Sequence, residues 1–128
     1  MFETSDSGTE EPPGDAGDAA DAVRLETLGD ALVLRIAGAL DLFLAPKVRQ
    51  GVDRARRLAA SVLVIDLTEV DFLASAGMAE LVRAHRLTPS MAVRVVATGR
   101  VTLRPLELTR LADELVIAPT LSAALDRV

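Results

Sequence analysis

Residues 62–81, VLVIDLTEVDFLASAGMAEL, decide the fold, because they join an apolar strand to an amphipathic helix through a short polar turn. The run of Val, Leu and Ile in SVLVIDL, at 61–67, is typical of a strand covered on both faces. Beyond the turn, Met78, Leu81 and Val82 share one helical stripe, and Pro89 ends the helix. The stretch therefore predicts a central strand followed by a crossover helix.

Strands and helices alternate on both sides of this stretch. Two strands precede it, at 22–28 and 31–38, with a turn between them, and Pro46 opens a helix whose apolar face holds Val48, Val52, Ala55 and Ala59. After it we expect a strand at 91–99, a helix that Thr102 caps and that runs to about Leu111, a strand at 115–119, and a helix capped by Thr120. This order predicts the α/β class: a mostly parallel mixed sheet of about five strands, the first antiparallel, flanked by four helices.

The charge of the chain divides it into two parts. Of the 128 residues, 1–21 carry seven acidic side chains and no basic one, which leaves the remainder near +2 although the whole chain has a net charge of −5. Such a segment, with almost nothing to bury, is expected to be a disordered acidic tail. Residues 22–128 are then the single folded domain.

Several function classes are excluded by composition. The chain has three Phe, neither Trp nor Tyr, and no basic cluster, so neither base stacking nor phosphate binding favours a nucleic-acid partner. With no Cys and one histidine, His85, we expect no metal site, and the absence of a Gly-rich phosphate loop argues against a nucleotide cofactor. We expect a cytoplasmic protein without membrane insertion, because no secretory signal or apolar run of membrane-spanning length is present.

Two loops carry the candidate site. GALDLFLAP, at 38–46, and DFLASAGM, at 71–78, follow strands whose carboxyl ends meet at one edge of a parallel sheet. A phosphoryl group on Ser75 would lie at the positive end of the following helix and would add about −1.5 to −2 charges. Ser75 could equally be the helix N-cap, Gly77 could supply backbone freedom in the turn, and Asp41 could be an ordinary loop carboxylate.

At these residues the chain resembles the STAS family, the anti-sigma factor antagonists and their relatives. GALDL resembles the family's strand end, residues 62–81 resemble its central strand, loop and helix, and PLELTRLADELVIAPTLSAAL, at 105–125, resembles its last elements. The resemblance covers about residues 22–128 and implies the STAS (SpoIIAA-like) fold. It also implies a non-enzymatic antagonist that binds a kinase-like anti-sigma factor with an ATP-binding fold and so frees a sigma factor. The implied partner-binding residues are Asp41, Leu73, Ala74, Ser75, Ala76, Gly77 and Met78.

The loop departs from the family pattern at two positions. Ala76 stands where the family has its phosphate-accepting hydroxyl, and Ala74 stands where it has Asp. Three interpretations remain: Ser75 is the phosphorylation site, the antagonist is unswitched, or the chain belongs to another branch. Ser75-Ala76-Gly77 is similar to the Thr-Ala-Gly of STAS subunits that bind the ATPase of lipid-transport ABC systems. A small hydrolase is disfavoured, because Ser75 and His85 lie nearly three turns apart on one helix.

Overall fold

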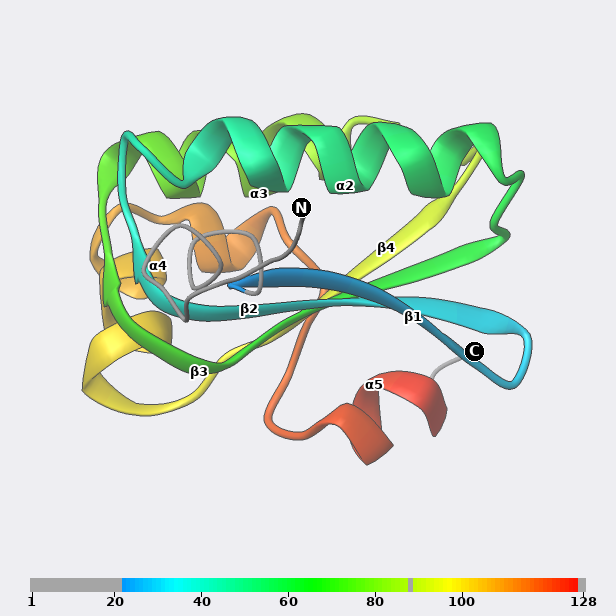
Figure 1. Cartoon of the computed structure of the whole chain (residues 1–128). Helices are drawn as coiled ribbons and strands as arrows, with labels where there is room; N and C mark the ends of the chain where they lie inside the picture. The colour runs from blue at the N-terminus through cyan, green and yellow to red at the C-terminus, as the bar shows by residue number, and fades with distance from the viewer. Residues whose placement is uncertain (1–21, 88, 127–128) are drawn as a thin grey trace, which may run out of the picture.

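One mixed sheet organises the part of the chain that the computed structural model describes, residues 22–87 and 89–126. Its strands lie in the order β1-β2-β3-β4-β5 (Figure 1). β1 pairs antiparallel with β2, and the three other pairs are parallel. The strands are β1 Val23–Leu28, β2 Ala31–Leu40, β3 Val62–Leu73, β4 Ala92–Val96 and β5 Ile117–Ala118. The predicted class and the antiparallel first strand are confirmed, whereas the predicted tail, 1–21, lies outside the described residues.

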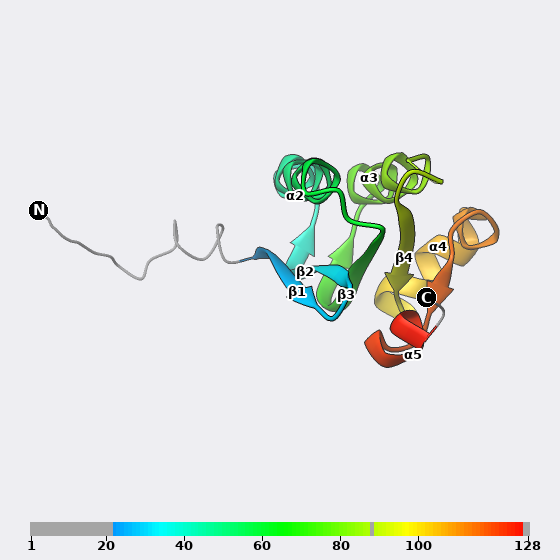
Figure 2. The ribbon, with the colours of Figure 1, turned by 90° about the vertical axis from the view of Figure 1, so that its right-hand side faces the viewer.

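Helices cover the two faces of the sheet unequally. α2, Ala45–Arg57, and α3, Ser75–His85, lie side by side on one face, and the short α5, Leu121–Asp126, covers part of the other (Figure 2). The larger core fills the space beneath α2 and α3, and its fully buried members include Leu34, Val48, Val52, Leu63, Ile65 and Leu81. A smaller core lies around Ala124 of α5. No helix within these described ranges has the length and apolar character that a membrane crossing needs.

The central strand is confirmed and is longer than the apolar run alone suggests. Residues 62–67 are buried without interruption, as expected for a strand with both faces covered. β3 then continues through Leu73, because β2 continues beside it to Leu40 after two register shifts. The predicted loop at 71–78 is therefore shorter, and it turns directly from the strand into α3.

Four predicted helix details are wrong. α2 ends at Arg57, so Ala59, with φ of 59°, lies outside its apolar face. Gly99, with φ of 75°, turns the chain after β4, and a π-helical turn at Gly99–Leu103 begins there. Thr102 therefore lies inside this turn. Its side chain hydrogen-bonds to Thr98 and does not cap the following helix. α4, Arg104–Leu108, stops short of the predicted end, and a 3₁₀ turn follows at Leu111–Asp113. The remaining error concerns Ser75 and belongs to the site. Thr120 does cap α5, since Ala123 N donates to its Oγ1 at 3.0 Å.

Candidate partner-binding site

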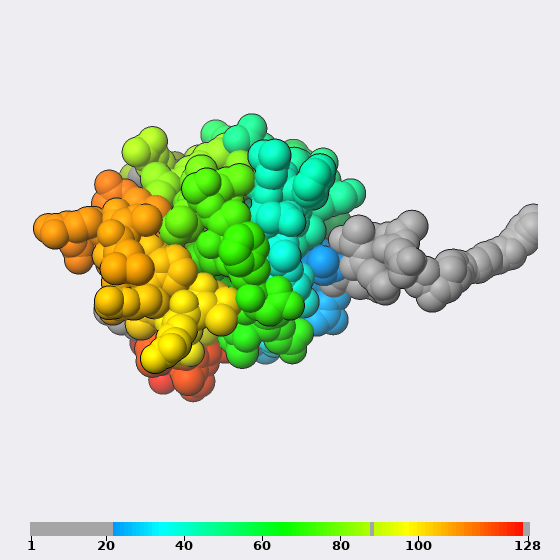
Figure 3. Space-filling view, turned by 90° about the vertical axis from the view of Figure 1, so that its left-hand side faces the viewer, coloured from blue at the N-terminus to red at the C-terminus, as the bar shows by residue number. Residues whose placement is uncertain are grey.

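The carboxyl ends of the parallel strands form one face of the molecule (Figure 3). There the loop from β2 to α2, the junction of β3 with α3, and the turn after β4 lie next to one another, as their colours show. The two predicted loops therefore meet, as the topology of a parallel sheet requires. This face, from here on the loop face, is where the predicted site residues gather.

Ser75 is exposed at the start of α3. Ala74, with φ of −92° and ψ of 167°, is the N-cap residue, and its amide donates to Leu40 O at 3.0 Å. Ser75 is the first residue of the helix and makes no capping hydrogen bond, so the N-cap prediction for Ser75 is wrong. The Ser75 hydroxyl is therefore not used to cap the helix. It lies next to the unpaired backbone amides in the first turn of this 11-residue helix.

Gly77 is needed for close packing and not for a special backbone angle. Its φ is not positive, so backbone freedom does not explain it. A Cβ built on Gly77 would lie 2.5 Å from Leu40 Cγ and 2.8 Å from Leu40 O. The missing side chain lets the first turn of α3 sit against the end of β2, and thereby brings Ser75 close to the β2–α2 loop.

Asp41 organises the β2–α2 loop. Its Oδ1 accepts hydrogen bonds from the amides of Phe43 and Leu44, both at 3.0 Å, and its carbonyl accepts from Ala45 N. This arrangement holds a short turn in which Leu42 is 69% exposed and Phe43 is 86% exposed. The carboxylate of Asp41 thus serves its own loop, and the loop displays apolar side chains to solvent.

The apolar residues at the end of β3 are divided between core and surface. Leu73 is 6% exposed and packs in the core, so it offers a partner almost no surface. Its neighbour Phe72 faces the other way and is 55% exposed. Sequence reasoning missed Phe43 and Phe72 as candidates; the available signal was the concentration of two of the chain's three Phe residues in these loops.

Ser75 also borders a hollow between α3 and the segment that follows α4. This hollow, about 410 Å³, has Met78, Val82 and Leu111 among its lining residues, with Arg83 and Arg86 as its charged members. Met78 Sδ lies 3.8 Å from Thr109 Oγ1. Apolar lining with a basic border can accept an apolar side chain of a partner next to Ser75.

A charged cluster fixes α2 against α3. Arg49 Nη2 donates to Glu80 Oε2 at 3.0 Å and Arg49 Nε donates to Glu80 Oε1 at 3.3 Å, while the Glu80 side chain is only 9% exposed. The hydrogen bonds that Arg49 donates to Glu80 raise the pKa of Arg49. Arg83 joins the cluster by a 2.8 Å hydrogen bond to Asp53. The pairing sets the spacing of the two helices whose first turns flank the loop face.

Replacing Arg49 by methionine is expected to lower the free energy of unfolding and the urea midpoint. The variant keeps an apolar stem but leaves the buried Glu80 carboxylate with Arg83 alone, whose Nη1 is 4.0 Å from it. The double variant Arg49→Met/Glu80→Met should recover much of this loss, because no buried charge then remains. Urea unfolding of Arg49→Met, Glu80→Met and the double variant measures the coupling between the two side chains. A loss in the double variant equal to the sum of the two single losses would contradict it.

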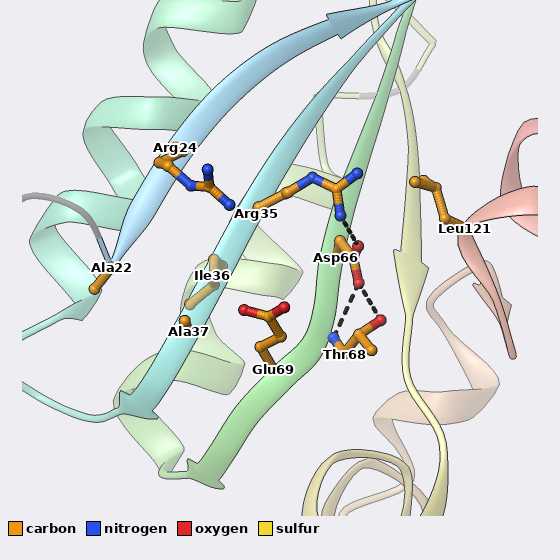
Figure 4. A pocket seen from close by; sticks show the side chains of 9 residues that line it. All are labelled: Ala22, Arg24, Arg35, Ile36, Ala37, Asp66, Thr68, Glu69 and Leu121. Carbon is orange, nitrogen blue, oxygen red and sulfur yellow. Dashed lines mark hydrogen bonds and ion pairs between the residues drawn. The ribbon is translucent and has the colours of Figure 1, made fainter.

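A second hollow, about 580 Å³, opens on the sheet face that α2 and α3 leave free (Figure 4). Asp66 lies in it, 4% exposed, and accepts from Arg35 Nη1 at 3.1 Å, from Thr68 N at 2.9 Å and from the Thr68 hydroxyl. Arg35 also donates to Glu26 at 2.8 Å, a hydrogen bond that lowers the pKa of Glu26 and raises the pKa of Arg35. Asp66 is thus a structural acid within β3, and none of the predicted site residues lines this hollow.

The arrangement offers little to a hydrolytic mechanism. His85 is the last residue of α3, half-buried, ten residues beyond Ser75, which puts the two roughly 15 Å apart along the helix. His85 cannot serve Ser75 as a base over this distance. Within the described ranges, no three His, Cys, Asp or Glu side chains are grouped so that they could hold a metal ion.

Comparison with known proteins adds the family. The STAS domain model matches residues 22–124. The anti-sigma-F factor antagonist RsfB of Mycobacterium tuberculosis is 35% identical over 97 residues, which are 75% of this chain and 80% of RsfB. A crystal structure of an anti-sigma factor antagonist from Mycobacterium paratuberculosis has a TM-score of 0.78 at 33% identity, covering 83% of this chain and 92% of that one. The Bacillus cell fate determinant SpoIIAA in its phosphorylated form has a TM-score of 0.62 at 19% identity, covering 83% and 98%, and shows the shared fold alone.

The chain therefore belongs to the STAS domain family. Within this family it groups with the anti-sigma factor antagonists, the class to which the mycobacterial relatives' names assign them. The family resemblance of the loop and helix motif is thereby confirmed.

Proposed function

We propose that this protein binds an anti-sigma factor with a kinase-like ATP-binding fold through its loop face, and thereby releases a sigma factor. The observation that carries the proposal is the exposure of Phe43 and Leu42 on the loop that adjoins the β3–α3 junction, in a chain of the antagonist class. Large apolar side chains held in solvent by an ordered loop are a feature of interfaces. The role is one of binding without catalysis, and it requires a cytoplasmic location.

Rigid presentation of the loop supports this role. The β2–α2 turn is held by the two hydrogen bonds to Asp41, and the β3–α3 junction is held by the bond from Ala74 to Leu40. Both loops leave strands that are paired in one sheet, so a partner meets a surface that needs little ordering on binding. The implied contacts at Ala74, Ser75, Ala76 and Met78 border this surface, whereas Leu73 and Gly77 support it from inside.

The direct test is a titration of the purified full chain with kinase-like anti-sigma factors of the same cell, followed by calorimetry. We expect a dissociation constant of about 1 µM or below for one of them, and displacement of its sigma factor. If every kinase-like anti-sigma factor tested kept its sigma factor and did not bind this protein when the protein was in excess, the proposal would be refuted. Binding to an ABC-transporter ATPase in its place would favour the lipid-transport interpretation.

We further propose that Ser75 is the residue on which the partner places phosphate. Its side chain is exposed while Ala76, at the family's usual position, has no hydroxyl. A phosphoryl group there would be tolerated by the positive end of α3, so the fold would survive while the charge and hydration of the interface would change. The apolar surface nearby makes a dianion unfavourable for the partner to cover.

The variant Ser75→Glu is expected to weaken binding about tenfold without changing the unfolding midpoint. The added carboxylate is stabilised by the helix N-terminus in the free protein but must lose its water at the interface. The matched control is Ser75→Gln, which has similar size and no charge and should bind more tightly than the Glu variant.

Mass spectrometry after incubation with the partner and ATP locates any phosphate. We expect one phosphate on Ser75 in the native chain and none in Ser75→Ala. The variant Ala76→Ser restores a hydroxyl at the usual acceptor position and shows that the partner is an active kinase. If only Ala76→Ser were modified, Ser75 would not be an acceptor and the chain would be an unswitched antagonist.

A further inference from the structure

A groove with a basic border runs between β1 and α2, from the first turn of α2 to its last. It encloses about 480 Å³, and Val23, Leu25 and Leu34 form its apolar floor. Gly51 allows α2 to lie close above this floor, since a Cβ there would come within 2.6 Å of Leu34 Cδ1. Three basic side chains of α2 line it, Lys47, Arg54 and Arg57, and no acidic residue does so within the described part of the chain.

These three cations have no acidic partner among residues 22–87 and 89–126. Between Ala22 and Asp126, Thr88 aside, the ion pairs engage Arg24, Arg35, Arg49, Arg83, Arg104 and Arg110 but none of the three. Each is exposed, and they recur along one side of α2 at spacings of seven and three residues. Like charges aligned beside an apolar floor repel one another, so an acidic ligand would relieve the repulsion.

The floor of the groove includes an open sheet edge. β1 is the first strand of the sheet and pairs with β2 alone. Ala22 O accepts from Ala37 N at 2.8 Å, and the alternation of an antiparallel ladder then directs the backbone N–H and C=O groups of Val23 and Leu25 away from β2. The groove thus offers unpaired main-chain groups next to the basic side chains, which suits an extended acidic segment.

We propose that residues 1–21 of this same chain occupy the groove. They carry Glu3, Asp6, Glu10, Glu11, Asp15, Asp18 and Asp21 and no basic residue, which complements the three cations. They join the described fold at Ala22, directly before the strand that forms the groove's edge. Covalent attachment gives them an effective concentration in the millimolar range, which an acidic partner in solution would have to exceed.

The length of the segment allows this placement. β1 has 6 residues and is roughly 20 Å long. Residues 12–21, which include Pro12, Pro13, Gly14 and Gly17, could span roughly 30 Å and could reverse the chain, so that the acidic residues before Pro12 can reach every part of the groove.

A spin label on the full chain tests the proposal. The chain has no cysteine, so Ser7→Cys gives one attachment point. We expect loss of the amide NMR signals of Leu25, Lys47 and Arg54, and no loss at Ala84 or Ala124. Raising the salt concentration to about 1 M, where the screening length is about 3 Å, should restore the signals. Unchanged signals around the groove at low salt, or a loss that salt does not relieve, would overturn the proposal.

Two further arms assign the cause of the loss. Lys47→Glu/Arg54→Glu/Arg57→Glu should abolish it, whereas the control Arg86→Glu/Arg104→Glu/Arg110→Glu changes the net charge equally and should keep it. A spin-labelled chain without isotopes is mixed with an isotope-labelled chain that carries no spin label. This mixture should show no loss of the amide signals. A loss in the mixture would show that the segment binds a second copy, and equal behaviour of the two triple variants would show that the basic groove is not the site.

Discussion

Replacing Gly77 by alanine should lower the free energy of unfolding by about 2–3 kcal/mol, the upper part of the range for overpacking. The new Cβ would be placed 2.5 Å from Leu40 Cγ and 2.8 Å from Leu40 O. The side chain of Leu40 is fully buried, and its carbonyl accepts the hydrogen bond from Ala74, so neither atom can withdraw freely. Relief requires α3 to move away from β2, which weakens packing along the first turn.

Urea unfolding, with the slope compared between variants, measures this effect. Ser75→Ala is the matched control, two residues away on the same turn but exposed, and should change the free energy by less than about 0.5 kcal/mol. A Gly77→Ala protein with the native midpoint would show that the helix and strand do not pack as tightly as described. Because the same contact places Ser75 beside the β2–α2 loop, we also expect weaker partner binding in this variant.

The sequence predicts the topology of the sheet correctly, but it does not predict the turns between the elements. Two patterns in the sequence were sufficient for the topology. The nearly continuous apolar run at 62–67 indicates a strand buried on both faces, and the helical spacing of apolar residues indicates α2 and α3. The ends of elements depend on tertiary contacts that one strand does not reveal. β3 reaches Leu73 because β2 extends beside it, and the chain after β4 turns at Gly99 before Thr102 can act as a cap.

The site was predicted as a location more than as a set of contacts. Strand ends in a parallel sheet converge, so the order of strands and helices alone assigns the two loops to one face. Which side chain points outward could not be assigned, because Phe72 and Leu73 are both apolar and their alternation depends on the register with β2. Likewise Gly77 required knowledge of Leu40, a residue of another element.

Phe43→Ala should weaken binding of the anti-sigma factor about 30-fold, or about 2 kcal/mol, with no change in the unfolding midpoint. The Phe43 ring is 86% exposed, so its removal leaves no cavity in the free protein. On binding, burial of an aromatic ring supplies a large apolar area, and the hydrogen bonds of Asp41 hold the loop so that little ordering is lost.

Leu58→Ala is the control for this prediction, because Leu58 is 57% exposed and follows the last residue of α2, at the end of the helix away from the loop face. It should bind like the native chain. Asp41→Ala distinguishes the ordering of the loop from the contact that the Phe43 ring makes with the partner. It keeps Phe43 but removes two hydrogen bonds from the loop, so the affinity for the partner should fall by less than in Phe43→Ala. Equal affinities for native, Phe43→Ala and Leu58→Ala proteins would place the interface elsewhere, since a ring this exposed contributes to binding only if the partner covers it.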